Sequence, residues 1–218
     1  MSSVFAQLST LGASAVLLTA LIPLWRRHVP AYISAFKWQS VALALVTTTV
    51  GFAAEVHELY VAAALIVGVR VIAMPILLRK MQARIGPLIE LDPYLNVPAS
   101  LLVAALLVGV AYGVARPAVL VATLPTSGAM PLAIAVVLVS LFVIASRKKA
   151  ISQIIGFLML ENGITLLSVV ASYGVPLAIE LGVFLDALLA FLVMQVFVFD
   201  IHETFESIDV DQLNRLKH

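Results

Sequence analysis

Long apolar runs, separated by short polar or basic stretches, dominate the chain. Seven of them come close to the roughly 20 residues that a helix needs to cross a hydrocarbon core about 30 Å thick. They cover approximately residues 4–25, 36–54, 59–78, 97–115, 131–145, 150–173 and 177–199. The pattern predicts an all-α, multi-pass transmembrane helix bundle of about seven spans.

Proline marks several expected breaks in this pattern. Residues 85–98 contain two proline-bearing turns and are expected to form the one substantial loop. The fourth run is expected to end at Arg116-Pro117, and residues 118–130 to lie as a linker at the outer surface. Within the third run, Pro75 has no N–H to donate to the preceding turn, so a local bend is expected there.

The composition supports a membrane protein with little mass outside the bilayer. Of the 218 residues, 62% are hydrophobic and 11% are charged, whereas soluble domains carry about 25% charged residues. No cysteine is present, which excludes disulfides, thiolate metal sites and cysteine-ligated iron–sulfur clusters. A formal net charge of +1 gives no reason to expect a nucleic acid or another polyanion as partner.

The basic residues fall almost entirely on one side of the predicted spans. Arg116 alone flanks the opposite side, and Arg70 lies inside a span. The positive-inside rule therefore predicts an N-terminus outside and a C-terminus in the cytoplasm. The residues on the predicted cytoplasmic side are Arg26, Arg27, Lys37, Arg79, Lys80, Arg84, Arg147, Lys148, Lys149, Arg215 and Lys217.

Four ionisable residues are expected within or close to the hydrocarbon: Arg70, Glu161, Glu180 and Asp186. Glu161 lies about 16 Å from the basic end of its run, and Arg70 and Asp186 fall at a similar depth. Glu180 is only about 6 Å inside the outer surface. Because a buried charge without a partner is costly, we expect Arg70 to meet an acidic residue, of this chain or another subunit, or water inside the protein.

Glu161 is the strongest candidate for a functional residue, because a carboxylate near the midplane costs roughly 2.5–3.5 kcal/mol on insertion scales. Thr165, Ser168 and Ser172 fall within about 40° of it on a helical wheel and extend towards the outer surface. Towards the cytoplasm the same face is apolar. This pattern favours proton relay, with Arg70 as a fixed charge. The alternatives are a carboxylate that serves packing only and, for Arg70, a static ion pair with Glu161 or Asp186.

Other chemistries have no suitable residues. The five lysines lie in loops, in the tail or, in the case of Lys37, at the edge of a predicted span, so a retinal Schiff base has no candidate, and the four histidines lie outside the spans. No phosphate-binding glycine loop or nucleophile motif occurs. We therefore expect no cofactor, no metal and no self-contained catalysis.

Three motifs in the second half resemble the K-type subunit of respiratory complex I. They are Arg147-Lys148-Lys149, the segment 156–163 with its Leu-Glu-Asn-Gly element, and the tail around Ile208-Asp209. This resemblance covers only residues from Pro131 onwards. A K-like half preceded by four further helices is similar to component E of hydrogenase-4, from the family of membrane-bound group 4 nickel–iron hydrogenases and related complexes.

The resemblance implies three parts: residues 1–130 as a four-helix membrane extension with an outer linker, 131–199 as a K-like three-helix core, and 200–218 as a cytoplasmic amphipathic tail. It implies that Glu161 matches the glutamate of the family's central proton-conducting axis. Asp186 best matches the acid of the following helix, with Glu180 as the competitor, because the connecting loop is shorter here and the acid is an aspartate.

The expected function is that of a cofactor-free membrane-arm subunit of a proton-translocating oxidoreductase in a bacterial or archaeal inner membrane. Its expected partners are antiporter-like and quinone-subunit-like membrane chains, and the lipid bilayer. Two alternatives remain. One is the C-type subunit of a multisubunit sodium/proton antiporter, which, like the K-type subunit, consists of the three-helix core alone. The other is a purely structural or assembly subunit.

The tail from Asp200 to His218 has apolar residues at roughly helical spacing and five acidic residues against two basic ones. A helix that lies on an anionic inner leaflet is expected to be basic instead. The pattern therefore favours docking of the tail on another protein over contact with lipid, with a solvated, frayed tail as the alternative.

Overall fold

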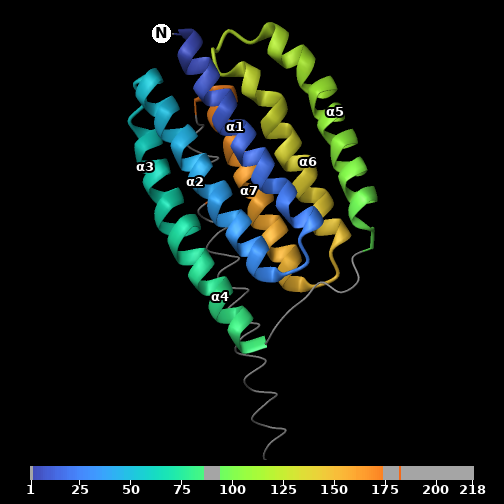
Figure 1. The fold of residues 1–218 in the computed structure, drawn as a ribbon. Coiled ribbons are helices and arrows are strands. Elements are labelled where there is room, and N and C mark those ends of the chain that lie inside the picture. The colour runs from blue at the N-terminus through green and yellow to red at the C-terminus, as the bar shows by residue number, and fades with distance from the viewer. Residues whose placement is uncertain (1, 86–93, 174–181, 183–218) are drawn as a thin grey trace, which may run out of the picture. The chain divides into compact units, whose positions relative to one another are not determined.

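The computed structural model describes residues 2–85, 94–173 and 182, all of which belong to one compact unit that spans Met1–Gly182. Every regular element in this described part is helical (Figure 1). Among the described residues, six helices are long and apolar enough to cross a membrane, as expected for the first six predicted runs. The predicted seventh span and the tail lie outside the described residues.

The first two spans form an antiparallel pair. Helix α1 covers Ser2–Trp25 and α2 covers Val29–Ala54. We expected the second span to begin near Phe36, and this was wrong by seven residues. His28 is extended and Pro30 occupies the first turn of α2, where the missing N–H costs nothing, so the helix begins immediately after the Arg26-Arg27 pair. Lys37 consequently lies inside α2 and not at its end.

The third span is a continuous rod of three segments: α3 (Glu58–Leu65), a π-helical segment η1 (Ile66–Ala73) and α4 (Met74–Ile85). In η1 each turn is one residue wider, and Met74 N donates to Val69 O, five residues back. Pro75 follows directly and cannot donate to the carbonyl of Val71. The local distortion expected beside Arg70 is therefore a stretch of wide turns.

Helix α5 (Val97–Val121) begins at Asn96, whose side chain accepts a hydrogen bond from Ala99 N. We expected this span to end at Arg116-Pro117, but α5 continues through both residues. Pro117 removes one internal hydrogen bond, yet the following apolar residues keep theirs, and Ala122 N still donates to Ala118 O. In an apolar environment a helix satisfies its backbone better than a loop would.

A short linker with a 3₁₀ turn, η2 (Ser127–Ala129), leads into α6 (Met130–Ser146). Helix α7 (Ala150–Ser172) follows and runs antiparallel to α6. The two helices pack closely because α7 presents glycine towards α6: a Cβ added to Gly163 would lie 2.9 Å from Val136 Cγ1 and 3.0 Å from Val137 N. Small residues at such positions let transmembrane helices approach each other.

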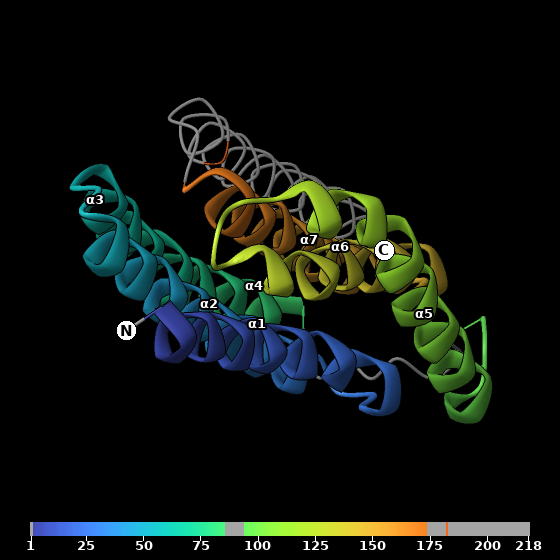
Figure 2. The ribbon, with the colours of Figure 1, turned by 90° about the horizontal axis from the view of Figure 1, so that it is seen from above.

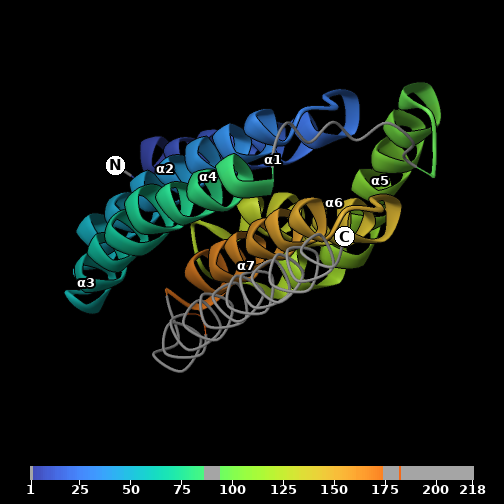
Figure 3. The same cartoon turned by 90° about the horizontal axis from the view of Figure 1, so that it is seen from below.

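Four helices, α1, α2, α6 and α7, form the centre of the described unit, with α1 against α2 and α6, and α7 against α6 and α2. The α3–η1–α4 rod packs on α2, and α5 packs on α6 at the other side (Figures 2 and 3). Helix α5 is the least buried of the spans. The segment that carries Arg70 therefore lies next to α2, and α7 packs on α2 as well.

Arg147 closes the basic end of this bundle. Its side chain is 2% exposed, and Nη2 donates to the carbonyl oxygen of Pro23 in the last turn of α1. The guanidinium carbon also lies 5.7 Å from the centre of the Tyr32 ring. A cation at a helix C-terminus satisfies carbonyls that have no partner within the helix. Arg147 thus ties the α6–α7 connection to α1 and α2.

Candidate functional site: a buried charge pair

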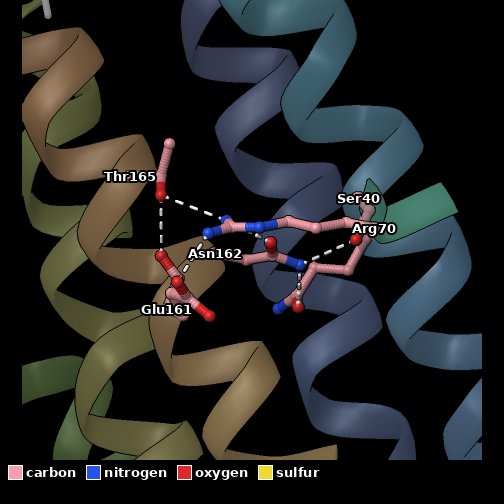
Figure 4. A network of polar contacts seen from close by, with 6 residues as sticks. Ser40, Arg70, Glu161, Asn162 and Thr165 are labelled. Atoms are coloured by element: carbon pink, nitrogen blue, oxygen red, sulfur yellow. Dashed lines mark hydrogen bonds and ion pairs between the residues drawn. The ribbon is translucent and has the colours of Figure 1, made fainter. Parts of the chain in front are cut away.

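Arg70 and Glu161 form an ion pair inside the bundle. Arg70 Nη2 lies 2.9 Å from Glu161 Oε1, and both side chains are 4% exposed. They come from segments far apart in the sequence, η1 and α7 (Figure 4). In the part of the chain that the structure describes, Glu161 is the only acidic residue inside a candidate span away from its ends. The expectation that Arg70 meets an acidic residue is confirmed.

The other end of the guanidinium is held by two side chains of α7. Arg70 Nη1 donates to Asn162 Oδ1 at 2.9 Å and to Thr165 Oγ1 at 3.1 Å. The hydroxyl of Thr165 in turn donates to the backbone oxygen of Glu161 at 2.9 Å. Residues 161, 162 and 165 lie on adjacent turns of one helix, which is why a single arginine can reach all three.

Asn162 links the charge pair to α2. Its Nδ2 donates to Gln39 Oε1 and to Ser40 Oγ, at 3.0 Å in each case. Gln39 Nε2 reaches the backbone oxygen of Val16 on α1 at 3.4 Å, and Ser40 Oγ donates to the oxygen of Phe36. The polar network therefore crosses the bundle laterally, from η1 through α7 and α2 to α1, as Figure 4 shows for its central part.

All members of this network are buried. Gln39, Ser40 and Asn162 have no exposed surface, and Thr165 is 8% exposed. Buried polar groups are costly unless they find partners, and each of these side chains has at least one. A buried network in which each group is bonded holds its members in one arrangement. The arrangement fixes the position of the guanidinium at both ends.

The structure brings together three of the six residues predicted for a proton pathway: Arg70, Glu161 and Thr165. Ser168 is half-buried one turn further along α7, and its backbone oxygen accepts a hydrogen bond from the exposed Ser172. Glu180 and Asp186 lie outside the described residues. The predicted polar face of α7 thus includes one direct partner of the charge pair, Thr165.

Sequence reasoning missed Asn162, Gln39 and Ser40. Asn162 was noted only as part of the Leu-Glu-Asn-Gly element, although an amide next to the buried acid was a usable signal. Gln39 and Ser40 lie immediately after Lys37-Trp38, at the predicted start of the second span near Phe36. With α2 beginning at Val29, the two residues lie three turns inside the helix.

Several known proteins are similar to this chain. The profile of the family described as NADH-ubiquinone/plastoquinone oxidoreductase chain 4L matches residues 129–218. An uncharacterized protein of Mycobacterium tuberculosis is 34% identical over 214 residues, which is 98% of this chain and 97% of that protein. Hydrogenase-4 component E of Escherichia coli is 28% identical over 184 residues, which is 84% of each chain. No solved structure matches the chain.

The extents of these matches differ. The chain 4L profile begins at residue 129, just before α6, whereas the other two relatives also match much of the preceding four spans. The segment that supplies Arg70 lies before the matched region of chain 4L, and Glu161 lies within it. The charge pair thus joins the part of the chain that resembles chain 4L to the part that precedes it.

Proposed function

Because this chain belongs to the hydrogenase-4 and complex I-like family of membrane subunits, we propose that its Arg70–Glu161 pair is a proton-handling element of the complex. The chain is a multi-pass membrane subunit of a proton-translocating complex, and membership of the family implies other membrane-arm subunits around it. The observation that carries the proposal is the nearly complete burial of an ion pair within apolar spans.

In this proposal Glu161 carries the proton and Arg70 is a fixed counter-charge. A carboxylate can accept and release a proton, whereas an arginine side chain stays protonated in proteins. When Glu161 binds a proton, its attraction for Arg70 falls, and the guanidinium keeps Asn162 and Thr165 as partners. Proton binding is thereby coupled to the contacts between η1 and α7.

The two branches of the network have different roles in the proposal. Thr165 has a hydroxyl that both donates and accepts, and Ser168 follows one turn later, so this face of α7 is the route for protons. The amides of Asn162 and Gln39 do not titrate, so their branch holds Arg70 in place. Asp186 and Glu180 remain candidates for the next acid along the route.

The finer assignments follow from the family and the charge distribution. We place the chain in a bacterial or archaeal inner membrane, with the end that carries Arg26, Arg27 and Arg147 towards the cytoplasm. Its neighbours are antiporter-like and quinone-subunit-like membrane chains. Residues 131–199 form the K-like core, residues 1–130 the extension, and the tail docks on a neighbouring protein. Electron transfer takes place elsewhere in the complex.

The proposal is tested with the assembled complex in proteoliposomes, by following proton translocation with a pH-sensitive dye during turnover. Glu161→Gln keeps the size of the side chain and an oxygen for Arg70 but cannot ionise, so coupled translocation is expected to fall strongly. Glu161→Asp keeps an ionisable group and is expected to retain more transport. Glu58→Gln, the same change at an exposed carboxylate, is the matched control. Normal pumping by a fully assembled Glu161→Gln complex would refute the proposal.

A further inference from the structure

Gly182 lies directly against the charge pair, and this contact depends on its having no side chain. A Cβ added to Gly182 would lie 3.1 Å from Arg70 Nη2 and 3.5 Å from Glu161 Oε1. These are the two atoms that form the ion pair. Gly182 itself is buried. Among the glycines of the described residues, Gly182 is the one whose added Cβ would meet charged side-chain atoms.

The need for glycine here is a need for space and not for an unusual backbone. The φ angle of Gly182 lies outside the left-handed range in which other residues are strained. An alanine at this position would therefore keep the backbone conformation. The new methyl group would instead come closer to Arg70 Nη2 than nine in ten real Cβ contacts do, so one of the two groups has to move by a few tenths of an ångström.

Arg70 has little freedom to move away. One end of its guanidinium is held by Asn162 and Thr165, and the other end by Glu161. Because the guanidinium is planar and rigid, a shift of Nη2 by a few tenths of an ångström also disturbs the two contacts of Nη1. A methyl group at Gly182 would therefore act on the pair through the arginine.

From this geometry we propose that Gly182 is a positioning residue, whose lack of a side chain leaves room for Arg70 and Glu161 to stay in contact. The inference rests on the proposed function insofar as it links this contact to proton translocation. A side chain at position 182 would change the distance between Arg70 and Glu161, while both ionisable groups would stay the same. Gly182 thus sets how readily Arg70 and Glu161 separate.

The test compares Gly182→Ala with Gly109→Ala in the assembled complex. Gly109 lies on the exposed face of α5, and a Cβ added there meets nothing within 4 Å, so it provides the same substitution without the contact. Gly182→Ala is expected to lower coupled proton translocation about fivefold. This is the factor that corresponds to about 1 kcal/mol, the lower end of the free-energy cost of overpacking by a methyl group. Gly109→Ala is expected to leave it unchanged. Equal transport in the two variants would overturn the proposal.

A second background shows whether the effect passes through the arginine. Arg70→Lys keeps a positive charge but removes the Nη2 atom that the new methyl group would meet. In this background Gly182→Ala is expected to cause little further loss of transport. If Gly182→Ala prevents assembly of the complex, adding Arg70→Lys is expected to restore it. Independent, additive effects of the two substitutions, or failure of the double variant to assemble, would overturn the proposal.

An infrared readout separates positioning from general damage to packing. The carboxyl band of Glu161 is identified as the difference-spectrum signal that Glu161→Gln removes. Gly182→Ala is expected to shift this band and Gly109→Ala to leave it in place. If Glu161→Gln pumps normally while Gly182→Ala shifts the band, the proposed function fails but the contact stands. If Glu161→Gln abolishes pumping while Gly182→Ala behaves like Gly109→Ala, only the role of Gly182 fails.

Discussion

Removing one member of the Arg70–Glu161 pair is expected to destabilise the chain more than removing both. The two charges lie 2.9 Å apart with 4% of each side chain exposed. At an effective dielectric constant of about 20, their Coulomb attraction is about 6 kcal/mol. Most of that attraction offsets the cost of taking both charges out of water, so the pair contributes much less than 6 kcal/mol to net stability. Removing one member leaves the other charge buried, with its desolvation cost no longer offset by the attraction.

Methionine is a suitable replacement at both positions because it is uncharged, flexible and able to fill irregular space. Arg70→Met leaves the buried carboxylate without its cation, and Glu161→Met leaves a guanidinium that cannot lose its proton. Each single substitution is expected to cost about 3–5 kcal/mol in unfolding free energy. The double variant has no buried charge at this site. It retains mainly the cost of the Asn162 oxygen that loses its donor, about 1–3 kcal/mol.

The measurement is unfolding of the full-length chain in detergent micelles by added SDS, followed by the fluorescence of Trp25 and Trp38. The double variant is expected to unfold at higher SDS than either single variant. Glu58→Met, at the exposed first residue of α3, serves as the control for loss of a carboxylate that is not buried. A double variant that is destabilised by the sum of the two single effects would refute the reasoning, since the charges would then act independently.

Two further predictions concern packing and the basic end of the bundle. Gly163→Val is expected to cost about 1–3 kcal/mol by forcing side chains of α6 away, whereas Gly113→Val, into open space on α5, is expected to be nearly neutral in thermal unfolding. Arg147→Met is expected to cost about 1.5–3 kcal/mol in unfolding free energy because it removes a charged donor from the Pro23 carbonyl. Arg116→Met, at an exposed position, provides the control. Equal melting midpoints for these two arginine variants would contradict the structural role of Arg147.

The spans, and the need of Arg70 for a partner inside the protein, could be predicted because both follow from large free energies. A run of about 20 apolar residues has few stable places other than a membrane. Position in the sequence puts Arg70 and Glu161 at one depth, and a charge at the midplane is costly enough that Arg70 was expected to have a partner inside the protein. The resemblance to the hydrogenase-4 and complex I-like family, stated from a few motifs after Pro131, is confirmed by the comparisons.

The details that sequence reasoning missed depend on smaller energies. The predicted second span begins next to Lys37, although a lysine one or two turns from the interface can extend its charge to water along its apolar stem. Pro117 was taken as a helix end, although a helix in an apolar environment tolerates one missing hydrogen bond. Neutral amides such as Asn162 and Gln39 carry no charge that would demand a partner, so their alignment across two helices is visible only in three dimensions.

The order in which the chain is synthesised gives the charge pair a further consequence. Arg70 precedes its α7 partner Asn162 by 92 residues, which corresponds to about 5–20 s at usual rates of translation. During that interval Arg70 has no Glu161 to neutralise it, at a cost of about 2.5–3.5 kcal/mol near the bilayer centre. The α3–η1–α4 span is strongly apolar even with Arg70 included, with a mean hydropathy of 2.5, and its apolar residues offset this cost. Arg70 is therefore synthesised before its partner, and the ion pair can form only after the ribosome has extended the chain past residue 161.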